Sequence, residues 1–155
     1  MTTRLNAKAI APDAYKALRS LQDYIDACGL EKPLIELVKV RASQINGCAF
    51  CIAMHTADAV KGGESHARLH QLNAWRETEL FTPHERAALA LTDAVTLVAD
   101  THVPDEVYEE ARAQFSEEEL ANLSVAIVAI NGANRLNIAF RTVPGSYRAK
   151  VRAAE

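Results

Sequence analysis

Residues 36–55, ELVKVRASQINGCAFCIAMH, bring two cysteines, a histidine and a glutamate into one short stretch. An Asn-Gly pair just before the first cysteine interrupts one apolar helical pattern, and another pattern begins behind it. If residues 48–62 form a helix, Cys48, Cys51 and His55 occupy positions i, i+3 and i+7 on one face. Two thiols and an imidazole that face the same way predict a redox site or a metal site.

The glutamate at the start of this stretch is expected to meet the histidine at its end. Glu36 lies about ten residues before the Asn-Gly break, and His55 lies about eight residues after it. If the two helices fold back antiparallel, both side chains lie roughly 12–16 Å from the turn, at a rise of ~1.5 Å per residue. A buried carboxylate needs a partner, and His55 is expected to supply it directly or through a water. The alternative is that Glu36 pairs with Lys32, Lys39 or another exposed charge.

Helical periodicity continues through the rest of the chain, and no convincing strand pattern is found. Capping boxes at Thr82 and Ser116, and stops at glycine or proline, mark several helix ends. Gly132 is expected to kink or interrupt the last helix. Besides residues 48–62, the segments expected to be helical are 12–28, 33–46, 65–74, 87–99, 104–114, 120–130 and 134–140. The sequence therefore predicts a single all-α domain over residues 1–155, with about six to eight helices and a short basic tail from about residue 146.

Composition and charge limit the class of protein. The 155 residues are 49% hydrophobic and 24% charged, an ordinary mix for a soluble globular domain, and the net charge is -3. No basic face for nucleic acid is implied, no apolar run reaches membrane-spanning length, and the first residues lack the apolar core of a signal peptide. We therefore expect a cytoplasmic protein with neither a nucleic-acid nor a membrane partner. In a reducing compartment, a CxxC pair is more often catalytic or metal-binding than structural.

The two cysteines have the spacing that a redox dithiol needs. A CxxC pair at a helix start places a nucleophilic thiolate beside a second thiol that can resolve it. His55 can take and return a proton, and Glu36 would orient the imidazole. A peroxide would oxidise one thiolate to a sulfenic acid, the second thiol would close a disulfide, and an outside dithiol would reopen it. Proximity to His55 favours Cys51 as the first nucleophile, whereas the helix dipole favours Cys48.

A zinc site is the main alternative for the same residues. Zinc would take Cys48, Cys51 and His55 together with a fourth ligand drawn from Glu36, Cys28 or His66. Zinc motifs usually bring a second ligand pair at short spacing, and this chain has none. A c-type haem site is excluded because Ile52, and not a histidine, follows the second cysteine. A thioredoxin-like site is disfavoured because no strand precedes the pair.

The remaining polar and sulfur-containing residues have simpler interpretations. Cys28 lies on an apolar helical stripe and is expected to be a buried hydrophobic residue. Asn131, Asn134 and Arg135 are unusually polar for their place in the last helix. Capping and subunit contacts are the favoured explanation for them, and lining of the site is the alternative. Surface or capping roles are expected for the four other histidines, His66, His70, His84 and His102.

The combination of Glu36, the Cys48–Cys51 pair and His55 in an all-helical chain of this length resembles the alkylhydroperoxidase D / carboxymuconolactone decarboxylase superfamily. The likeness extends to residues 82–90, TPHERAALA, and to residues 130–147, INGANRLNIAFRTVPGSY. The resemblance implies a compact helical protomer that assembles into trimers or hexamers. It also implies that Cys51 is the peroxidatic cysteine, that Cys48 resolves it, and that Glu36 and His55 form a proton relay.

One residue departs from the pattern of this superfamily. Alkylhydroperoxidase D has a histidine just before the second cysteine, where this chain has Phe50. The change removes an imidazole from the relay and makes the site more apolar, so slower turnover or a bulkier substrate is expected. The decarboxylase branch generally lacks the paired cysteines, which disfavours lactone decarboxylation here.

Residues and resemblance together predict a thiol peroxidase or disulfide reductase. Its substrate would be a small-molecule peroxide, either hydrogen peroxide or an organic hydroperoxide. No bound cofactor is expected, and a lipoyl-protein or a thioredoxin-like protein would supply the external dithiol reductant. The alternatives are a zinc-binding or redox-sensing module without turnover, and a carboxymuconolactone-type decarboxylase.

Overall fold

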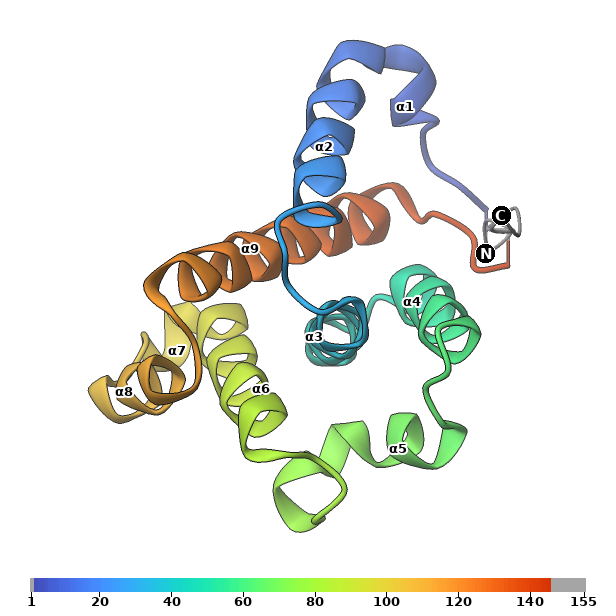
Figure 1. The fold of residues 1–155 in the computed structure, drawn as a ribbon. Coiled ribbons are helices and arrows are strands. Elements are labelled where there is room, and N and C mark those ends of the chain that lie inside the picture. The colour runs from blue at the N-terminus through green and yellow to red at the C-terminus, as the bar shows by residue number, and fades with distance from the viewer. Residues whose placement is uncertain (1, 146–155) are drawn as a thin grey trace, which may run out of the picture.

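The computed structural model describes residues 2–145, and this part of the chain is built from helices without strands (Figure 1). The expected all-α fold is confirmed. Six of the helices are ten residues or longer, and three α-helices and a 3₁₀-helix are shorter. The expected basic tail from about residue 146 lies outside the described residues. In chain order the elements are α1 (Ala7–Ile10), α2 (Pro12–Ile25), α3 (Lys32–Asn46), α4 (Ala49–Lys61), α5 (His66–Gln71), η1 (Leu72–Glu77), α6 (Pro83–Thr96), α7 (Val98–Thr101), α8 (Asp105–Gln114) and α9 (Glu117–Phe140).

Both predicted capping boxes are present and start α6 and α9, two helices that contribute to the core. The Thr82 hydroxyl accepts from the Glu85 backbone N–H at 3.2 Å, and the Glu85 carboxylate accepts from the Thr82 N–H at 2.8 Å. Ser116 and Glu119 make the same reciprocal pair at the start of α9. Each box satisfies backbone donors that the first turn of a helix leaves without partners.

The predicted interruption at Gly132 is wrong. Helix α9 runs without a break from Glu117 to Phe140. A glycine inside a helix costs only about 1 kcal/mol relative to alanine, and packing of the surrounding turns against other helices offsets that cost.

Several other boundaries also differ from the expected segments, and α2 ends at Ile25 rather than at residue 28. The segment 65–74 is split into α5 and a 3₁₀-helix, η1, with non-helical backbone at Ala74. The helix expected to end at residue 99 ends at Thr96, and the short helix α7 follows it. Helix α1 has only four residues and lies in a segment with no predicted helix. These are short or terminal pieces, for which sequence periodicity is weakest.

Helix α9 is the element around which the others pack. It contacts α2, α3, α4, α6 and α8, and in Figure 1 it crosses the molecule between α2 and the layer of α3 and α6. Leu123, Ala126 and Ile127 are fully buried members of a core that these helices share. By length and composition alone α9 could cross a membrane, since an 18-residue stretch within it has a mean hydropathy of 1.3. Its buried Asn122, together with its contacts to five helices, instead fits the core helix of a globular fold.

The hairpin of α3 and α4 positions the residues of interest. Gly47 ends α3 with a φ of 68°, in the left-handed region that glycine adopts without strain. Cys48 follows as the N-cap of α4, with extended backbone angles. These two residues between the helices therefore reverse the chain, and α4 packs back along α3.

Candidate functional site

The two cysteines of the CxxC pair form a buried dithiol. Cys48 precedes the first turn of α4 and Cys51 lies within that turn, and their exposed fractions are 2% and 0%. Both are free thiols. They pack in a small apolar cluster with Ala42 of α3 and Ile130 of α9, which Phe50 and Ala133 partly cover.

Cys48 is the more acidic of the two thiols. A hydrogen bond from Cys51 is the largest contribution to lowering its pKa to about 7. Burial acts in the opposite sense, while the backbone N–H groups of Cys51 and Phe50 and the side chain of Asn134 lower the pKa further. A thiol at a helix N-cap faces backbone donors that have no helical partner, which favours its thiolate.

Cys51 holds its proton in this arrangement. Its hydrogen bond to Cys48, then burial and the negative charge on Cys48, raise its pKa, although Asn134 and Asn137 act to lower it. The Asn137 side chain donates through Nδ2 to the Cys51 Sγ at 3.3 Å. Above a pH of about 7 the reduced pair therefore carries one negative charge, which the S–H group of Cys51 stabilises.

The structure brings Glu36 and His55 together across the hairpin. The His55 Nδ1 lies 2.8 Å from the Glu36 Oε2, and the side chains are only 8% and 19% exposed. Burial raises the pKa of Glu36, but the hydrogen bond and charge of His55, followed by those of Lys39, leave it below its usual value. An ionised carboxylate only accepts hydrogen bonds, so Nδ1 carries the proton and Nε2 is left to act as a base in the neutral ring.

The alternative partner for Glu36 is present at the same time. The Lys39 Nζ lies 3.3 Å from the Glu36 Oε1, and the lysine side chain is only 4% exposed. The carboxylate is thus held between a buried cation and the imidazole. Each of its oxygens has one of these partners.

Metal-ligating atoms gather in a different set from the expected zinc ligands. In residues 2–145 the ligand atoms of Glu36, His55 and Asp58 lie within 4.8 Å of one another. This set includes neither cysteine. Cys28 is half-buried beside the main core, with its thiol donating to the Ile25 carbonyl at 3.2 Å.

The other histidines lie away from these residues or at the surface. His66, His70 and His102 are exposed, as expected. His84 is half-buried, and its ring lies 4.1 Å from that of Phe115, measured between centroids.

Asparagines of α9 line the dithiol, a role that the sequence offered for Asn134 only as the less favoured explanation and did not offer for Asn137. Asn134 is fully buried and its side chain lowers the pKa of both thiols, and the Asn137 Nδ2 donates to the Cys51 Sγ. Asn46, at the end of α3, donates to the oxygens of Asn131 and Asn134, at 2.9 Å in each case. The signal in the sequence was the set of polar residues inside an apolar helix, but their partners lie some 85 to 91 residues away.

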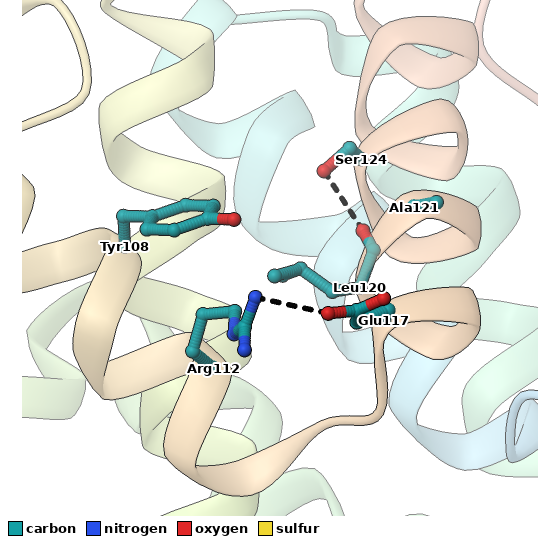
Figure 2. Close-up of a pocket in the computed structure, with 6 residues that line it drawn as sticks. All are labelled: Tyr108, Arg112, Glu117, Leu120, Ala121 and Ser124. Atoms are coloured by element: carbon teal, nitrogen blue, oxygen red, sulfur yellow. Dashed lines mark hydrogen bonds and ion pairs between the residues drawn. The ribbon is translucent and has the colours of Figure 1, made fainter.

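A surface hollow elsewhere on α9 does not belong to this site. It lies between α8 and the first two turns of α9 and is shown in Figure 2. Arg112 crosses it to pair with Glu117 at 3.3 Å. Its lining lies at the opposite end of α9 from Asn134 and Asn137, and comprises Tyr108, Arg112, Glu117, Leu120, Ala121 and Ser124.

These features define a class of helical proteins that hold a buried CxxC dithiol beside a Glu–His pair. A family model described as the carboxymuconolactone decarboxylase family matches residues 12–94. The chain belongs to this family, within the superfamily that also contains the alkylhydroperoxidase D-like proteins.

Relatives of known sequence and structure agree with this placement. The uncharacterized protein YdfG of Bacillus subtilis (strain 168) is 41% identical over 139 residues, or 90% of this chain and 95% of YdfG. A solved structure from Agrobacterium tumefaciens, described as a candidate antioxidant defence protein AhpD, is 42% identical with a TM-score of 0.91, covering 94% of this chain and 100% of its own. A peroxidase-related protein from Ralstonia eutropha JMP134 shares the fold, with 21% identity, a TM-score of 0.79, and coverage of 90% of this chain and 75% of its own.

Proposed function

We propose that this protein is a thiol peroxidase that reduces hydrogen peroxide or organic hydroperoxides through the Cys48–Cys51 dithiol. The observation that carries the proposal is a thiol pair with one lowered pKa at the start of the same helix that presents His55 to Glu36. The description of the Agrobacterium relative as a candidate antioxidant defence protein supports the same activity.

The proposed reaction consumes both thiols. The attacking thiolate bonds to one peroxide oxygen while the O–O bond breaks, giving a sulfenic acid and an alkoxide. His55 returns a proton to that alkoxide, which leaves as an alcohol, or as water from hydrogen peroxide. The second thiol displaces hydroxide from the sulfenic sulfur, so that a disulfide and a water form. An external dithiol then reduces the disulfide and is itself oxidised.

The order of attack needs one additional proton movement. We assign the attack to Cys51, as the resemblance implies, whereas the resting charge lies on Cys48. The Cys51 proton must therefore pass to His55 through water before attack, and it is this proton that His55 returns to the alkoxide. The hydroxide that the Cys48 thiolate displaces then takes a proton from solvent to form water. Asn137 then donates to the new thiolate.

Access to the buried sulfurs favours a substrate with apolar character. The half-buried Phe50 covers the cluster, and both sulfurs are almost inaccessible. An organic hydroperoxide can displace apolar side chains at a lower desolvation cost than a charged substrate can. The reductant is proposed to be a lipoyl-protein or a thioredoxin-like protein in the cytoplasm.

Intact-mass analysis tests the proposal directly. Reduced protein treated with one equivalent of cumene hydroperoxide should lose two hydrogens, and peptide mapping should place the new disulfide between Cys48 and Cys51. In Cys48→Ser protein a sulfenic acid should be trapped on Cys51. If the sulfenic acid is instead trapped on Cys48 in Cys51→Ser protein, and none is trapped on Cys51 in Cys48→Ser protein, the two roles are reversed. Unchanged mass with one bound zinc per chain would overturn the peroxidase proposal in favour of a metal-binding module.

A second candidate function follows from the family itself. A decarboxylase acting on a lactone would use Glu36 and His55 as acid and base and would not need the thiols. Its activity should survive replacement of both cysteines by serine, whereas peroxide reduction should not.

A further inference from the structure

We propose that Asn134 and Asn137 form an amide donor pair that binds the sulfur atoms of the dithiol and stabilises its thiolate form. This inference rests on the proposed dithiol chemistry and adds two residues that touch the reacting atoms. It rests on the hydrogen bonds that orient the Asn134 amide and on the bond from Asn137 to Cys51.

The orientation of Asn134 is set by two hydrogen bonds of opposite sense. Its Oδ1 accepts from the Asn46 Nδ2 at 2.9 Å, and its Nδ2 donates to the Ser43 Oγ at 3.0 Å. The oxygen therefore faces Asn46, and the second N–H of the amide remains for the thiols, since the Asn134 side chain lowers the pKa of both. At 0% exposure, Asn134 has no water to replace these partners.

A further layer of hydrogen bonds holds Asn46 in place. Its Nδ2 also donates to the Asn131 Oδ1 at 2.9 Å. Asn131 in turn donates to the Thr96 Oγ1 at 3.0 Å, and its oxygen accepts from Arg135 at 2.8 Å. Asn46 thus donates to the oxygens of both asparagines and is held between them, which fixes the amide of Asn134 against rotation.

Asn137 completes the pair one turn further along α9. Asn134 and Asn137 are three residues apart, so both side chains lie on the face that packs against α4. Asn137 donates to Cys51 at 3.3 Å. The pair therefore reaches both sulfurs from one rigid helix.

These donors are needed because the sulfur atoms are buried away from water. Removing a thiolate from water raises its pKa, and burial acts in this sense on both cysteines. Preorganised N–H groups replace the lost hydration without moving during the reaction. All charged and titratable groups on these helices other than the thiols are unchanged in the variants below: Lys32, Glu36, Lys39 and Arg41 of α3, His55, Asp58 and Lys61 of α4, and Glu117, Glu118, Glu119 and Arg135 of α9.

The test is a pH titration of the reduced full-length chain, in which ultraviolet absorbance measures how much thiolate has formed at each pH. A Cys28→Ser background removes the third thiol from the signal. Asn134→Leu in this background should raise the first titration midpoint by about one pH unit, a tenfold loss of thiolate below the midpoint. Asn137→Leu with Cys48→Ser, where Cys51 is the remaining thiol, should raise the Cys51 midpoint by a similar amount, and Asn137→Asp should raise it more because it adds a negative charge.

Asn122→Leu is the matched control, since Asn122 is a buried asparagine of the same helix that instead accepts from the Tyr24 hydroxyl at 2.8 Å. Its thiol midpoints should equal those of the background protein. Unshifted midpoints in both Asn137 variants, or an equal shift in the control, would overturn the donor pair even if Asn134→Leu fails to fold. If the midpoints shift but the wild-type protein consumes no peroxide, the donor pair is supported and the proposed peroxidase function is wrong.

Discussion

Lys39 is the residue whose position in the structure is most unusual for its chemistry. Its ammonium group is buried on α3 and lies near two carboxylates, Glu36 at 3.3 Å and Asp26 at 3.8 Å. A buried lysine is rare unless it is paired, and removal of one partner leaves an incompletely compensated charge. Lys39 therefore helps to keep Glu36 ionised beside His55.

The Lys39→Met variant tests this at the level of one residue. Because the pKa of Glu36 in the folded protein lies below 4.5, its ion pairs contribute stability that is fully present above that pH and is lost as the pH falls through the folded value. Lys39→Met should lower the free energy of unfolding by about 1–3 kcal/mol at neutral pH, and by less in acid. Urea unfolding at neutral and acidic pH measures both values.

Lys32→Met is the control for this prediction, because Lys32 is exposed on the same helix. Its unfolding free energy should change little at either pH. A loss of stability in Lys39→Met that is independent of pH would mean that the lysine acts through packing of its stem rather than through its charge.

The α3–α4 hairpin is the element that brings the residues of one short stretch of sequence together as a site. Its reversal depends on left-handed backbone at Gly47, and Cys48 becomes the N-cap of α4 directly behind it. The backbone donors that lower the Cys48 pKa are therefore a consequence of the turn.

Two glycine variants distinguish the role of Gly47 in the turn from that of a glycine in regular helix. Gly47→Ala should destabilise the protein by about 1 kcal/mol, because a Cβ is strained at a φ of 68°, although no atom lies within 4 Å of it. Gly132→Ala, in regular helix with open space around it, should instead stabilise the protein by about 0.4–1 kcal/mol. Thermal unfolding with a thiol titration of each variant provides the measurement. A destabilised Gly132→Ala together with an unaffected Gly47→Ala would contradict the assignment.

A half-buried ion network joins α3, η1 and α6. Arg41 binds Asp93 through two hydrogen bonds of 2.6 and 3.2 Å, and the Trp75 indole donates to the same carboxylate at 3.2 Å. Arg41 also donates to Asn73 at 3.0 Å. This network fixes α3 against α6 and so supports the helix that carries Glu36.

At the scale of the whole molecule, the surface of α9 remains partly apolar. Val128 is 60% exposed and Ile138 is 45% exposed, although both lie on the helix around which the fold packs. Exposed apolar positions on a central helix are typical of an association surface. We propose that a second copy of this chain covers them, in the trimer or hexamer that the resemblance implies.

Sedimentation analysis tests the assembly. The wild-type mass should be three or six times that of one chain, and Val128→Asp should shift it toward the monomer, because burial of an unpaired carboxylate opposes association. Lys8→Asp, on the short helix α1, is the control and should leave the mass unchanged. A wild-type monomer at every concentration would contradict the proposed assembly.

The sequence by itself determined the features that depend on residues close together in the chain. Helix periodicity, the capping boxes at Thr82 and Ser116, and the spacing of Cys48, Cys51 and His55 all arise within a few turns of one helix. The meeting of Glu36 with His55 was also predictable, because a short turn between two helices of known length leaves few relative positions.

Tertiary structure alone decided the continuity of α9 through Gly132, the ion network of Arg41 and Asp93, and the placement of Asn134 and Asn137 on the sulfurs. Each of these depends on contacts between segments that are far apart in the chain. Such contacts produce no periodic pattern in the sequence. An asparagine inside an apolar helix indicates that a partner exists, since a buried amide needs hydrogen bonds. Only the packed fold identifies the partner, because it selects one of many apolar surfaces to lie against that amide.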